Sequence, residues 1–431
     1  MSNQPSSVWP RISFGKITRK LVNGGTPPTE VEAFWNGKTP WITGADFTST
    51  GISEFRRFVS DSAIAQTSTN VIERGQLLLV TRTGVGKLAI APCDIAISQD
   101  ITGVYVDEEK ADTNFLFYRM RQGVEDLKKL NQGTSINGII RSDLVAYPLE
   151  LPPLPTQRRI AEMLSTVDEA IEQTEALIAK YQQIKAGLMH DLFTRGVTAD
   201  GRLRPTRAQA PHLYKDSPLG WIPKEWEVVP LSNVTHFITS GSRGWAEYYS
   251  EVGPLFIRIG NLTREHINFR WDSVRRVLLP NFTEGQRTAV QLNDILISIT
   301  ADLGIVAVAG NALGEAYINQ HIALVRPKVE SEVSRFLGHF LSTVRVQKQF
   351  LRLNDSGAKA GLNLPAIGKI LVVKPLDDLE AKRIAAMLDE VDLTIECHKQ
   401  EVAKLRQQKH GLMHDLLTGR VRVKVGQPAS T

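Results

Sequence analysis

The first group of residues that could do chemistry resembles a phosphate-binding loop. Residues 83–88 read Thr-Gly-Val-Gly-Lys-Leu, and backbone amides of such glycines can cradle a phosphate. A complete loop of this kind needs glycine at position 81 and serine or threonine after the lysine. Thr81 and Leu88 occupy those positions, so the run does not predict a nucleotide-hydrolysing site.

A second group has the residue types of a metal-dependent nuclease. Asp377, Asp378, Glu380 and Lys382 lie close together in the sequence. The spacing Asp377-x-x-Glu380 is also a capping-box pattern, and acidic residues stabilise the first turn of a helix. We therefore expect a helix start here.

A third group is a histidine-aspartate pair that occurs twice, as residues 190–191 and 414–415. Imidazole and carboxylate bind metals, but neither pair has further ligands at useful spacing, which favours a structural role at a helix end. The chain also lacks a Gly-x-Ser-x-Gly elbow, a Cys/His nucleophile set, a dinucleotide fingerprint and an Asn-Pro-Pro-Tyr-like tetrapeptide. These patterns predict no catalytic residues, no metal ligands and no cofactor site, and hence a protein that is not an enzyme.

The elements that would position any site are dominated by a repeat. Residues 159–197 return as residues 383–421, and 21 of 39 positions are identical without a gap at an offset of 224. So long a repeat indicates a duplicated structural unit.

Apolar residues in both copies follow the alternating three- and four-residue spacing of a helical seam. The seam positions are Ile160, Leu164, Val167, Ile171, Thr174, Ile178, Tyr181, Lys185, Leu188 and Leu192 in the first copy, and Ile384, Leu388, Val391, Ile395, His398, Val402, Leu405, Lys409, Leu412 and Leu416 in the second. Lys185 and Lys409 are polar at matched places, and polar seam residues fix register. We expect the two helices to pair as an antiparallel coiled coil, with Thr156 capping the first.

Weaker matches relate the segments between the helices. Ile-Ser-Gln at 97–99 matches Ile-Asn-Gln at 318–320, and the apolar run 76–81 resembles 294–300. Short β-rich runs alternate with glycine, proline and asparagine turns, and helical stretches near 113–130 and 333–351 follow. The β-rich runs are 76–81, 87–91, 101–106, 255–259, 294–299, 303–309 and 321–326.

The predicted fold class is α+β, with two mixed globular domains, two long helices and a pseudo-two-fold internal repeat. The expected divisions are 1–150 (first globular domain), 151–197 (first repeat helix), 198–220 (surface linker), 221–374 (second globular domain), 375–421 (second repeat helix) and 422–431 (tail).

Bulk properties add limits. Only two cysteines occur, Cys93 and Cys397, so neither a disulfide framework nor a zinc spacing exists and a reducing cytoplasm is expected. The first residues do not read as a signal peptide, and no run is long and apolar enough for a membrane span. The net charge of +5 is too small to predict nucleic-acid binding by itself.

This alternation of dissimilar globular parts and near-identical helices resembles the specificity subunit of type I restriction-modification systems. Its most specific marks are Leu-Pro-Pro-Leu-Pro-Thr-Gln-Arg-Arg-Ile-Ala at 151–161, Gly-Leu-Met-His-Asp-Leu at 187–192 and 411–416, Asn-Gly-Gly-Thr-Pro at 23–27 with Trp35 and Pro40-Trp41, Thr-Ser-Gly-Ser-Arg-Gly-Trp at 239–245, and Gly-Trp-Ile-Pro at 220–223. The first domain lacks a Gly-Trp-Ile-Pro lead-in, which is a departure.

The resemblance implies a division of labour. Each globular part would be a target-recognition domain that reads one half of a bipartite, asymmetric site in double-stranded DNA. The helices would set the spacing and dock two methylation subunits, which would hold S-adenosylmethionine and flip the target adenine. Restriction subunits would join through the complex and bring ATP- and Mg-dependent translocation and cleavage.

Candidate DNA-contacting residues are polar, basic or aromatic side chains in loops, because arginine and lysine read guanine and asparagine and glutamine read adenine. In the first domain they are Trp41, Thr43, Arg82, Thr83, Lys87, Gln99, Ser135, Asn137 and Arg141. In the second they are Ser242, Arg243, Trp245, Tyr248, Tyr249, Arg258, Asn261, Asn319, Gln320, Lys359 and Asn363. Trp41 also has the character of a core residue, and the matched glutamines also suit a role in stabilising turns.

Two alternatives of other classes stay open. One is a coiled-coil scaffold that joins partners other than DNA. The other is a single-chain nuclease or methyltransferase, which would turn over when it is purified alone with cofactors and DNA.

Overall fold

The structure is a computed structural model that describes residues 9–48, 51–52, 54–129, 138–278, 285–328, 331–354 and 361–424. Its contacts divide the chain into two compact units. Unit 1 comprises Met1–Glu175 and Glu401–Thr431, and unit 2 comprises Ala176–Gln400. Each unit therefore holds one globular part and a segment of both repeat helices, a division that differs from the predicted one at 150, 198 and 375.

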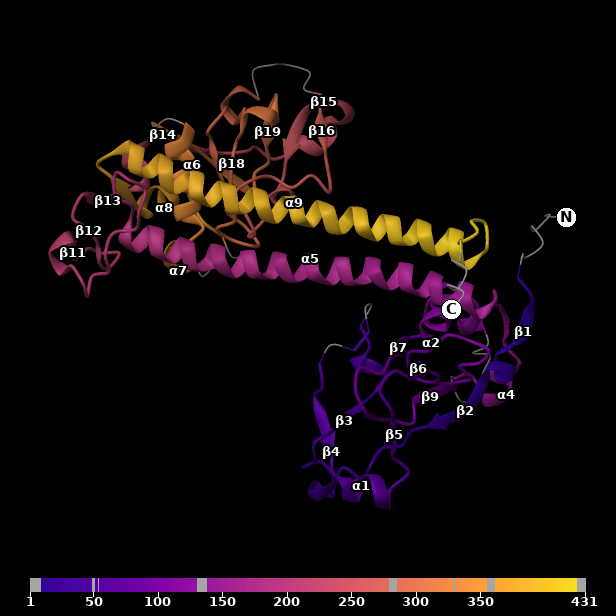
Figure 1. Ribbon diagram of the computed structural model, residues 1–431. Helices are drawn as coiled ribbons and strands as arrows, with labels where there is room; N and C mark the ends of the chain where they lie inside the picture. The colour runs from indigo at the N-terminus through magenta and orange to yellow at the C-terminus, as the bar shows by residue number, and fades with distance from the viewer. Residues whose placement is uncertain are drawn as a thin grey trace. The chain divides into compact units, whose positions relative to one another are not determined.

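The two repeat segments form the long helices α5 (Leu154–Arg195) and α9 (Asp378–Leu417) (Figure 1). The first begins two residues before Thr156, so this threonine lies inside the helix and is not its cap. None of the twenty predicted seam positions is exposed. The three- and four-residue spacing had therefore selected the covered face of both helices.

Within unit 1, the two helix segments run antiparallel. Lys409 forms an ion pair with Asp168, and Arg406 donates to Glu175 Oε1 across 2.6 Å. The residue number on α9 falls as the residue number on α5 rises, so the two segments run in opposite directions. Apolar side chains of both segments join the domain core, because Ile160, Leu164 and Leu416 belong to the same buried cluster as Phe14 and Phe115.

Unit 2 contains the complementary segments, and they also run antiparallel. The rings of Tyr181 and His398 stack with centroids 5.7 Å apart, and Lys185 Nζ lies 2.5 Å from Asp392 Oδ1. Asp392 and Lys185 are the repeat counterparts of Asp168 and Lys409. Each unit thus makes the same aspartate-lysine pair between the two helices.

Within the described residues, the globular part of unit 1 contains ten short strands in three sheets. The strands are β1 (Arg11–Ser13), β2 (Thr18–Asn23), β3 (Thr39–Ile42), β4 (Arg57–Val59), β5 (Asn70–Ile72), β6 (Leu77–Val80), β7 (Leu88–Ile90), β8 (Ile95–Ile97), β9 (Ile101–Val106) and β10 (Pro148–Glu150). The sheet orders are β2-β9-β6-β7, β4-β3-β8-β5 and β1-β10. All pairs are antiparallel except β3 with β8.

Unit 2 repeats this plan. Its strands are β11 (Tyr214–Lys215), β12 (Ile222–Pro223), β13 (Trp226–Pro230), β14 (Thr235–Ser240), β15 (Tyr249–Ile257), β16 (Arg276–Val277), β17 (Ile295–Ser298), β18 (Val306–Val308), β19 (Ala316–Ile318), β20 (Ile322–Pro327) and β21 (Leu371–Pro375). The orders β14-β20-β17-β18 and β13-β21 match those of unit 1, and β15 with β19 is the parallel pair. The sheet β16-β15-β19 corresponds to β4-β3-β8 without a described strand in the place of β5, and β11-β12 is an additional two-stranded sheet. The sequence matches between the domains therefore fall on equivalent strands.

Short helices complete both units. They are α1 (Asp61–Gln66), α2 (Thr113–Gln122), α3 (Val124–Lys129) and α4 (Arg141–Ala146) in unit 1, and α6 (Ser331–Leu341), α7 (Val344–Arg352) and α8 (Leu364–Lys369) in unit 2. The helical stretches expected at 113–130 and 333–351 are each broken into two helices. Gly123 ends α2, and Ser342 and Thr343 separate α6 from α7.

The predicted surface linker 198–220 is partly built into unit 2. Arg204 is buried and donates to Glu380 of α9, through Nη2 to Oε2 at 2.9 Å among other contacts. Glu380 also accepts from the backbone amide of Val197 at 2.9 Å. Glu380 was expected to close a capping box at the start of α9. Its carboxylate instead holds Val197 and Arg204, which lie in the segment after α5.

Two further predictions concern membrane spans and cysteines. Within the described residues, no helix is both long and apolar enough to cross a bilayer. Cys93 is half-buried and Cys397 is exposed, and both thiols are free.

Candidate nucleic-acid interface

In unit 1, four loops meet beside the end of the sheet β2-β9-β6-β7. Two of the loops follow β2 and β6, a third connects β8 to β9, and the fourth precedes α4. These loops line a hollow of about 440 Å³, and Arg82, Gln99 and Arg141 are among its walls. All three side chains are exposed. Two guanidinium groups and one amide thus lie together on a concave surface, which is a donor set suited to base edges and phosphates.

Backbone hydrogen bonds fix these loops to one another. The amide of Ile139 donates to Thr81 O at 2.7 Å, and the amide of Thr81 donates to Asp100 O at 2.8 Å. The hydroxyl of Thr83 reaches Asp100 Oδ1 at 3.3 Å. Because rigid strands anchor the loops, the exposed arginines are held on an ordered frame.

Gly24 permits this close packing. A Cβ atom at this residue would lie 2.0 Å from the carbonyl oxygen of Ile97, a distance that backbone cannot accommodate. Gly241 occupies the matching place in unit 2, where a Cβ would meet the carbonyl oxygen of Ile318 at 2.2 Å. Glycine is required in both loops because the neighbouring chain passes so near.

Unit 2 assembles the equivalent loops with different side chains. The amide of Leu362 donates to Ile299 O at 2.9 Å, and the amide of Ile299 donates to His321 O at 3.0 Å. These bonds correspond to those of Ile139 and Thr81 in unit 1. The backbone frame is therefore shared by the two units.

The groups presented on the unit 2 frame form a polar chain. Gln320 Nε2 donates to His321 Nε2 at 2.9 Å, and His321 Nδ1 lies 2.8 Å from the hydroxyl of Thr300. Arg287 donates to Thr239 Oγ1 at 2.7 Å and remains exposed. Where unit 1 presents Arg82 and Asp100, unit 2 presents Thr300 and His321, so the two surfaces offer different hydrogen-bonding patterns.

The sequence-predicted DNA contacts fall into four groups. Exposed are Arg82, Thr83, Lys87, Gln99, Arg141, Arg243, Tyr249 and Asn363; partly exposed are Thr43, Ser242, Tyr248, Arg258 and Gln320; buried are Trp41, Trp245, Asn261 and Asn319; and Ser135, Asn137 and Lys359 lie outside the described residues.

Four of the predicted DNA contacts are buried side chains. Trp41 is only 3% exposed and donates to Gly25 O at 3.0 Å, and Trp245 stacks on Phe256 at 5.0 Å. Asn261 is 2% exposed and donates to two backbone carbonyls, and Asn319 accepts from the amide of His321. Hydrogen bonds to backbone give Trp41, Asn261 and Asn319 roles inside the fold, and ring stacking does so for Trp245.

Three other predicted residues have local structural partners. Thr43 caps a short 3₁₀ turn, and Asn363 accepts from the amide of Ala366 at 2.8 Å and caps α8. Lys87 donates to Gly44 O at 2.8 Å. These contacts account for the residue types without DNA, although the side chain of Lys87 is exposed.

Sequence reasoning missed Asp100, His321 and Arg287. Asp100 and His321 directly follow the matched motifs Ile-Ser-Gln and Ile-Asn-Gln, so extending that match by one residue would have found them. Arg287 carries no comparable signal. It is remote in sequence from Thr239 and Ser242, whose hydroxyls it contacts.

The described residues contain one group with metal-ligand chemistry, formed by His339, Asp389 and Asp392 in unit 2. Arg335 and Lys185 already pair with the two carboxylates, so their negative charges are matched. Burial opposes ionisation of Asp389, but hydrogen bonds from His339 and Arg335 lower its pKa to about 2. Burial also lowers the pKa of His339. This arrangement is a charge-balanced structural network.

Comparison with known proteins identifies the same two-part plan. The family model for the type I restriction modification DNA specificity domain matches residues 13–183 and 223–407. The chain is 25% identical over 422 residues to the type I restriction enzyme MjaVIII specificity subunit of Methanocaldococcus jannaschii, covering 96% of this chain and 93% of the relative. It is 27% identical over 356 residues to the putative MjaX specificity subunit of that organism, covering 79% and 76%.

A solved structure agrees in fold. The crystal structure of the S subunit of a type I restriction-modification system from M. genitalium superposes with a TM-score of 0.64 at 17% identity, over 96% of this chain and 98% of that one. The family match covers most of the chain, in two segments that each contain one globular part and most of one repeat helix. The chain therefore belongs to the type I restriction-modification DNA specificity family, and its role is DNA target recognition as a specificity subunit of such a system.

Proposed function

We propose that each globular domain reads one half of a bipartite, asymmetric DNA site. The observation that carries this proposal is the repeated loop frame with different exposed groups. Arg82, Gln99 and Arg141 present donors in unit 1, whereas Gln320, His321 and Arg287 present a different set in unit 2. Two similar frames with unlike edges suit two unlike half-sites.

The helices act as a spacer between the two readers in this proposal. At about 1.5 Å per residue, the 42 residues of α5 extend about 60 Å, which exceeds one DNA turn of about 34 Å. The antiparallel segment pairs and their covered seam support a continuous antiparallel coiled coil. The matching strand orders support a pseudo-two-fold internal repeat.

The chain works with other subunits in this account. Two methylation subunits dock on the helices, bind S-adenosylmethionine and modify adenine, while restriction subunits supply ATP- and Mg-dependent cleavage. The chain itself is non-catalytic and cytoplasmic. Support comes from the family, and from a solved structure whose description concerns complex assembly in a type I system, with a TM-score of 0.51 at 18% identity over 98% of this chain.

Selection from random-sequence duplex DNA tests the proposal. The expected result is enrichment of two constant half-sites separated by a gap of fixed length. A lack of enrichment would favour a scaffold for partners other than DNA. Turnover by the purified chain with cofactors and DNA would favour a single-chain enzyme.

A further inference from the structure

Each unit carries an arginine at the same place on the edge strand beside its parallel strand pair. In unit 1, Arg57 is the first residue of β4 and lies opposite Trp41 of β3. In unit 2, Arg275 directly precedes β16, and its carbonyl oxygen accepts from the amide of Phe256 in β15 at 2.8 Å. Trp41 and Phe256 are equivalent, because the next residue of each strand pairs with the isoleucine of Ile-Ser-Gln or Ile-Asn-Gln. Arg57 and Arg275 therefore correspond.

The strand directions bring both arginines to the sheet end that carries the matched glutamines. β3 and β8 run parallel and β4 runs antiparallel to them, so the start of β4 lies at the same end as Gln99, which follows β8. The strands β16, β15 and β19 have the same directions in unit 2, with Gln320 beyond β19 (Figure 1). Neighbouring strands lie about 4.8 Å apart, so each arginine is displaced about 10 Å across the sheet from the strand that leads to the glutamine. A duplex can span this distance, because one DNA turn extends about 34 Å.

Both guanidinium groups are left with unmatched charge. The side chains of Arg57 and Arg275 are exposed, and neither forms an ion pair or a hydrogen bond with a described residue. The adjacent Arg56 is already engaged, because its Nη2 lies 2.5 Å from Asp46 Oδ1. An exposed and unmatched cation is the kind of group that attracts a DNA phosphate.

Aromatic rings hold Arg57 in position. Its guanidinium carbon lies 5.8 Å from the ring centroid of Trp35 and 5.7 Å from that of Trp41. The indole N–H of Trp35 donates to Pro28 O at 3.1 Å. That of Trp41 donates to Gly25 O at 3.0 Å, and both acceptors belong to the loop that follows β2. A guanidinium held over aromatic faces keeps its N–H groups free for a phosphate and loses less entropy when it binds one.

The fold does not account for the arginine in unit 2. The guanidinium of Arg275 makes no hydrogen bond, ion pair or ring contact with a described residue. The sheet uses only its backbone carbonyl, which any residue would supply. An arginine is nevertheless present where unit 1 has one, which points to a shared role toward another molecule.

Phosphate is the DNA group that both units meet in the same form. The loop frames differ, with Arg82 and Asp100 in unit 1 and Thr300 and His321 in unit 2. Contacts to bases change with the sequence that is read, whereas contacts to the backbone carry no sequence information. An arginine retained beside two different frames therefore fits the backbone.

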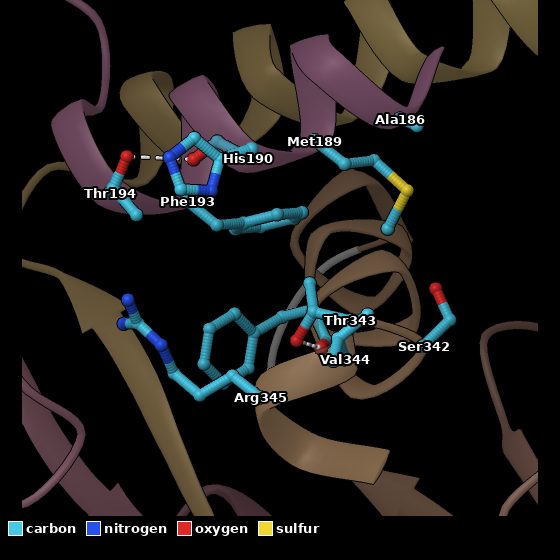
Figure 2. Close-up of a pocket in the computed structure, with 10 residues that line it drawn as sticks. Ala186, Met189, His190, Phe193, Thr194, Ser342, Thr343, Val344 and Arg345 are labelled. Atoms are coloured by element: carbon cyan, nitrogen blue, oxygen red, sulfur yellow. Dashed lines mark hydrogen bonds between the residues drawn. The ribbon is translucent and has the colours of Figure 1, made fainter. Parts of the chain in front are cut away.

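Another arginine of unit 2 has a different setting. Arg345 lines an apolar groove of about 250 Å³ beside α5, with Met189 and Phe193 on the opposite wall (Figure 2). Its Nη1 is buried without a hydrogen-bond partner among the described residues, and burial lowers the pKa of this arginine. A guanidinium recessed in a groove is less accessible to a duplex than one on an edge strand, which limits the inference to Arg57 and Arg275.

We propose that Arg57 and Arg275 each bind a backbone phosphate and position their domain on its half-site without reading bases. The inference rests on the proposed function, because it requires both domains to contact DNA. It adds a division of roles within each domain, in which the edge strand holds the duplex and the loop frame reads it. Trp35 and Trp41 serve DNA binding indirectly, by holding Arg57.

Binding of the full chain to random-sequence duplex DNA, measured at several salt concentrations, tests this inference. Each lost phosphate contact reduces the slope of log affinity against log salt by about 0.9. Arg57→Gln and Arg275→Gln should each show this decrease, and the double variant should show a decrease of about 1.8. Each single variant should also lose about tenfold in affinity, by the same factor on duplexes with the selected site and on scrambled ones.

Arg57→Lys and Arg74→Gln are the controls. Lysine keeps the charge, so Arg57→Lys should keep most of the salt slope. Arg74 is an exposed arginine of unit 1 that follows β5 at the opposite end of the sheet, and its loss should leave the slope unchanged. Misfolding is not expected for Arg275→Gln, because the removed guanidinium has no partner in the described part of the chain, and its thermal melt should match that of wild type.

Unchanged salt slopes in both single variants, with binding by wild type intact, would overturn the phosphate assignment and leave half-site reading in place. A decrease in only one variant would overturn the shared role. A loss confined to the selected site would overturn the proposal as well, because it assigns the arginines to bases. Reduced slopes without a split site in the selection would retain the phosphate contacts and refute only the reading of half-sites.

Discussion

Units 1 and 2 share a framework and differ where they face outward. Two of their sheets have the same strand order and a third differs by one strand, and each unit makes an aspartate-lysine pair between the long helices. At the loop frame, Asp100 and Arg82 in unit 1 give way to His321 and Thr300 in unit 2. The retained contacts hold the fold together, and the diverged contacts suit different DNA sequences.

The helix junction shows a finer difference. In unit 1, Asp168 accepts from Tyr118 at 2.7 Å in addition to Lys409. The equivalent aspartate in unit 2, Asp392, pairs with Lys185, and its second oxygen is buried without a partner among the described residues. Asp392 therefore depends on one cation, whereas Asp168 has two donors.

The largest expected effect is loss of the lysine in unit 2. Lys185→Met leaves the 2% exposed Asp392 carboxylate without its cation and should lower the free energy of unfolding by about 3 kcal/mol. Lys409→Met should cost about 1 kcal/mol, because Asp168 is more exposed and keeps Tyr118. Amide hydrogen exchange of each helix segment, with chemical denaturation of the full chain, measures both.

Lys180→Met is the control for this pair of variants, since Lys180 is exposed and lies outside the seam. It should change stability by less than about 0.5 kcal/mol. Equal losses for Lys185→Met and Lys409→Met would contradict the difference between the two junctions.

Next in size is the effect of removing one reading arginine. Arg82→Ala should weaken binding to one half-site by about 2 kcal/mol, close to thirtyfold, because a base-reading arginine contributes discrimination of this order. Arg243→Ala should weaken the other half-site. Competition binding with duplexes mutated in either half measures the split.

Arg74→Ala, an exposed arginine of unit 1 that does not line the hollow, is the control for the unit 1 variant. An equal loss on specific and scrambled DNA would show that an arginine contacts phosphate and not a base.

The smallest effect is on pH dependence, and it should appear in unit 2. Burial lowers the pKa of His339 below its ordinary 6.5, against the opposing influence of Asp389 and Asp392. The unfolded chain therefore binds a proton more readily, so this contribution to stability is present above pH 6.5 and is lost as pH falls below it. The slope cannot exceed about 1.4 kcal/mol per pH unit for one proton.

The stability that ionised Asp389 contributes is lost as the pH falls from about 3.8 to about 2, which is below the range in which His339 titrates. Arg335 and Lys185 also adjoin the network. Denaturation of His339→Gln between pH 5 and 8 should show a shallower slope than wild type. Burial raises the pKa of Tyr118, which donates to Asp168 in unit 1, so Tyr118→Phe should leave the slope unchanged in this range.

The long helices were predictable because one physical signal repeats many times along them. Apolar spacing marks each turn, and the duplicated sequence gives the signal twice, so only the ends were misplaced by a few residues. The register lysines were recognised as polar seam positions. Their partners Asp168 and Asp392 were not, because a contact between helices depends on their alignment in space.

The interface was harder to predict because burial is a tertiary property. Tryptophan and asparagine in loops suit DNA contacts equally well whether they face solvent or core, and Trp41 and Asn261 proved to be buried. Gln99 and Gln320 were found through a match between the domains. The linker around Arg204 reads as polar and proline-rich, and only the fold brings Glu380 to it.

The central claim is that two dissimilar domains of one chain each read their own half of a split DNA site. Mapping methylated adenines in cells that carry wild type, Arg82→Ala or Arg243→Ala tests it most directly. We expect a bipartite motif with a constant gap that depends on this chain, and each variant should relax one half while keeping the gap and the other half. A contiguous motif, or relaxation of both halves by a single variant, would contradict the claim.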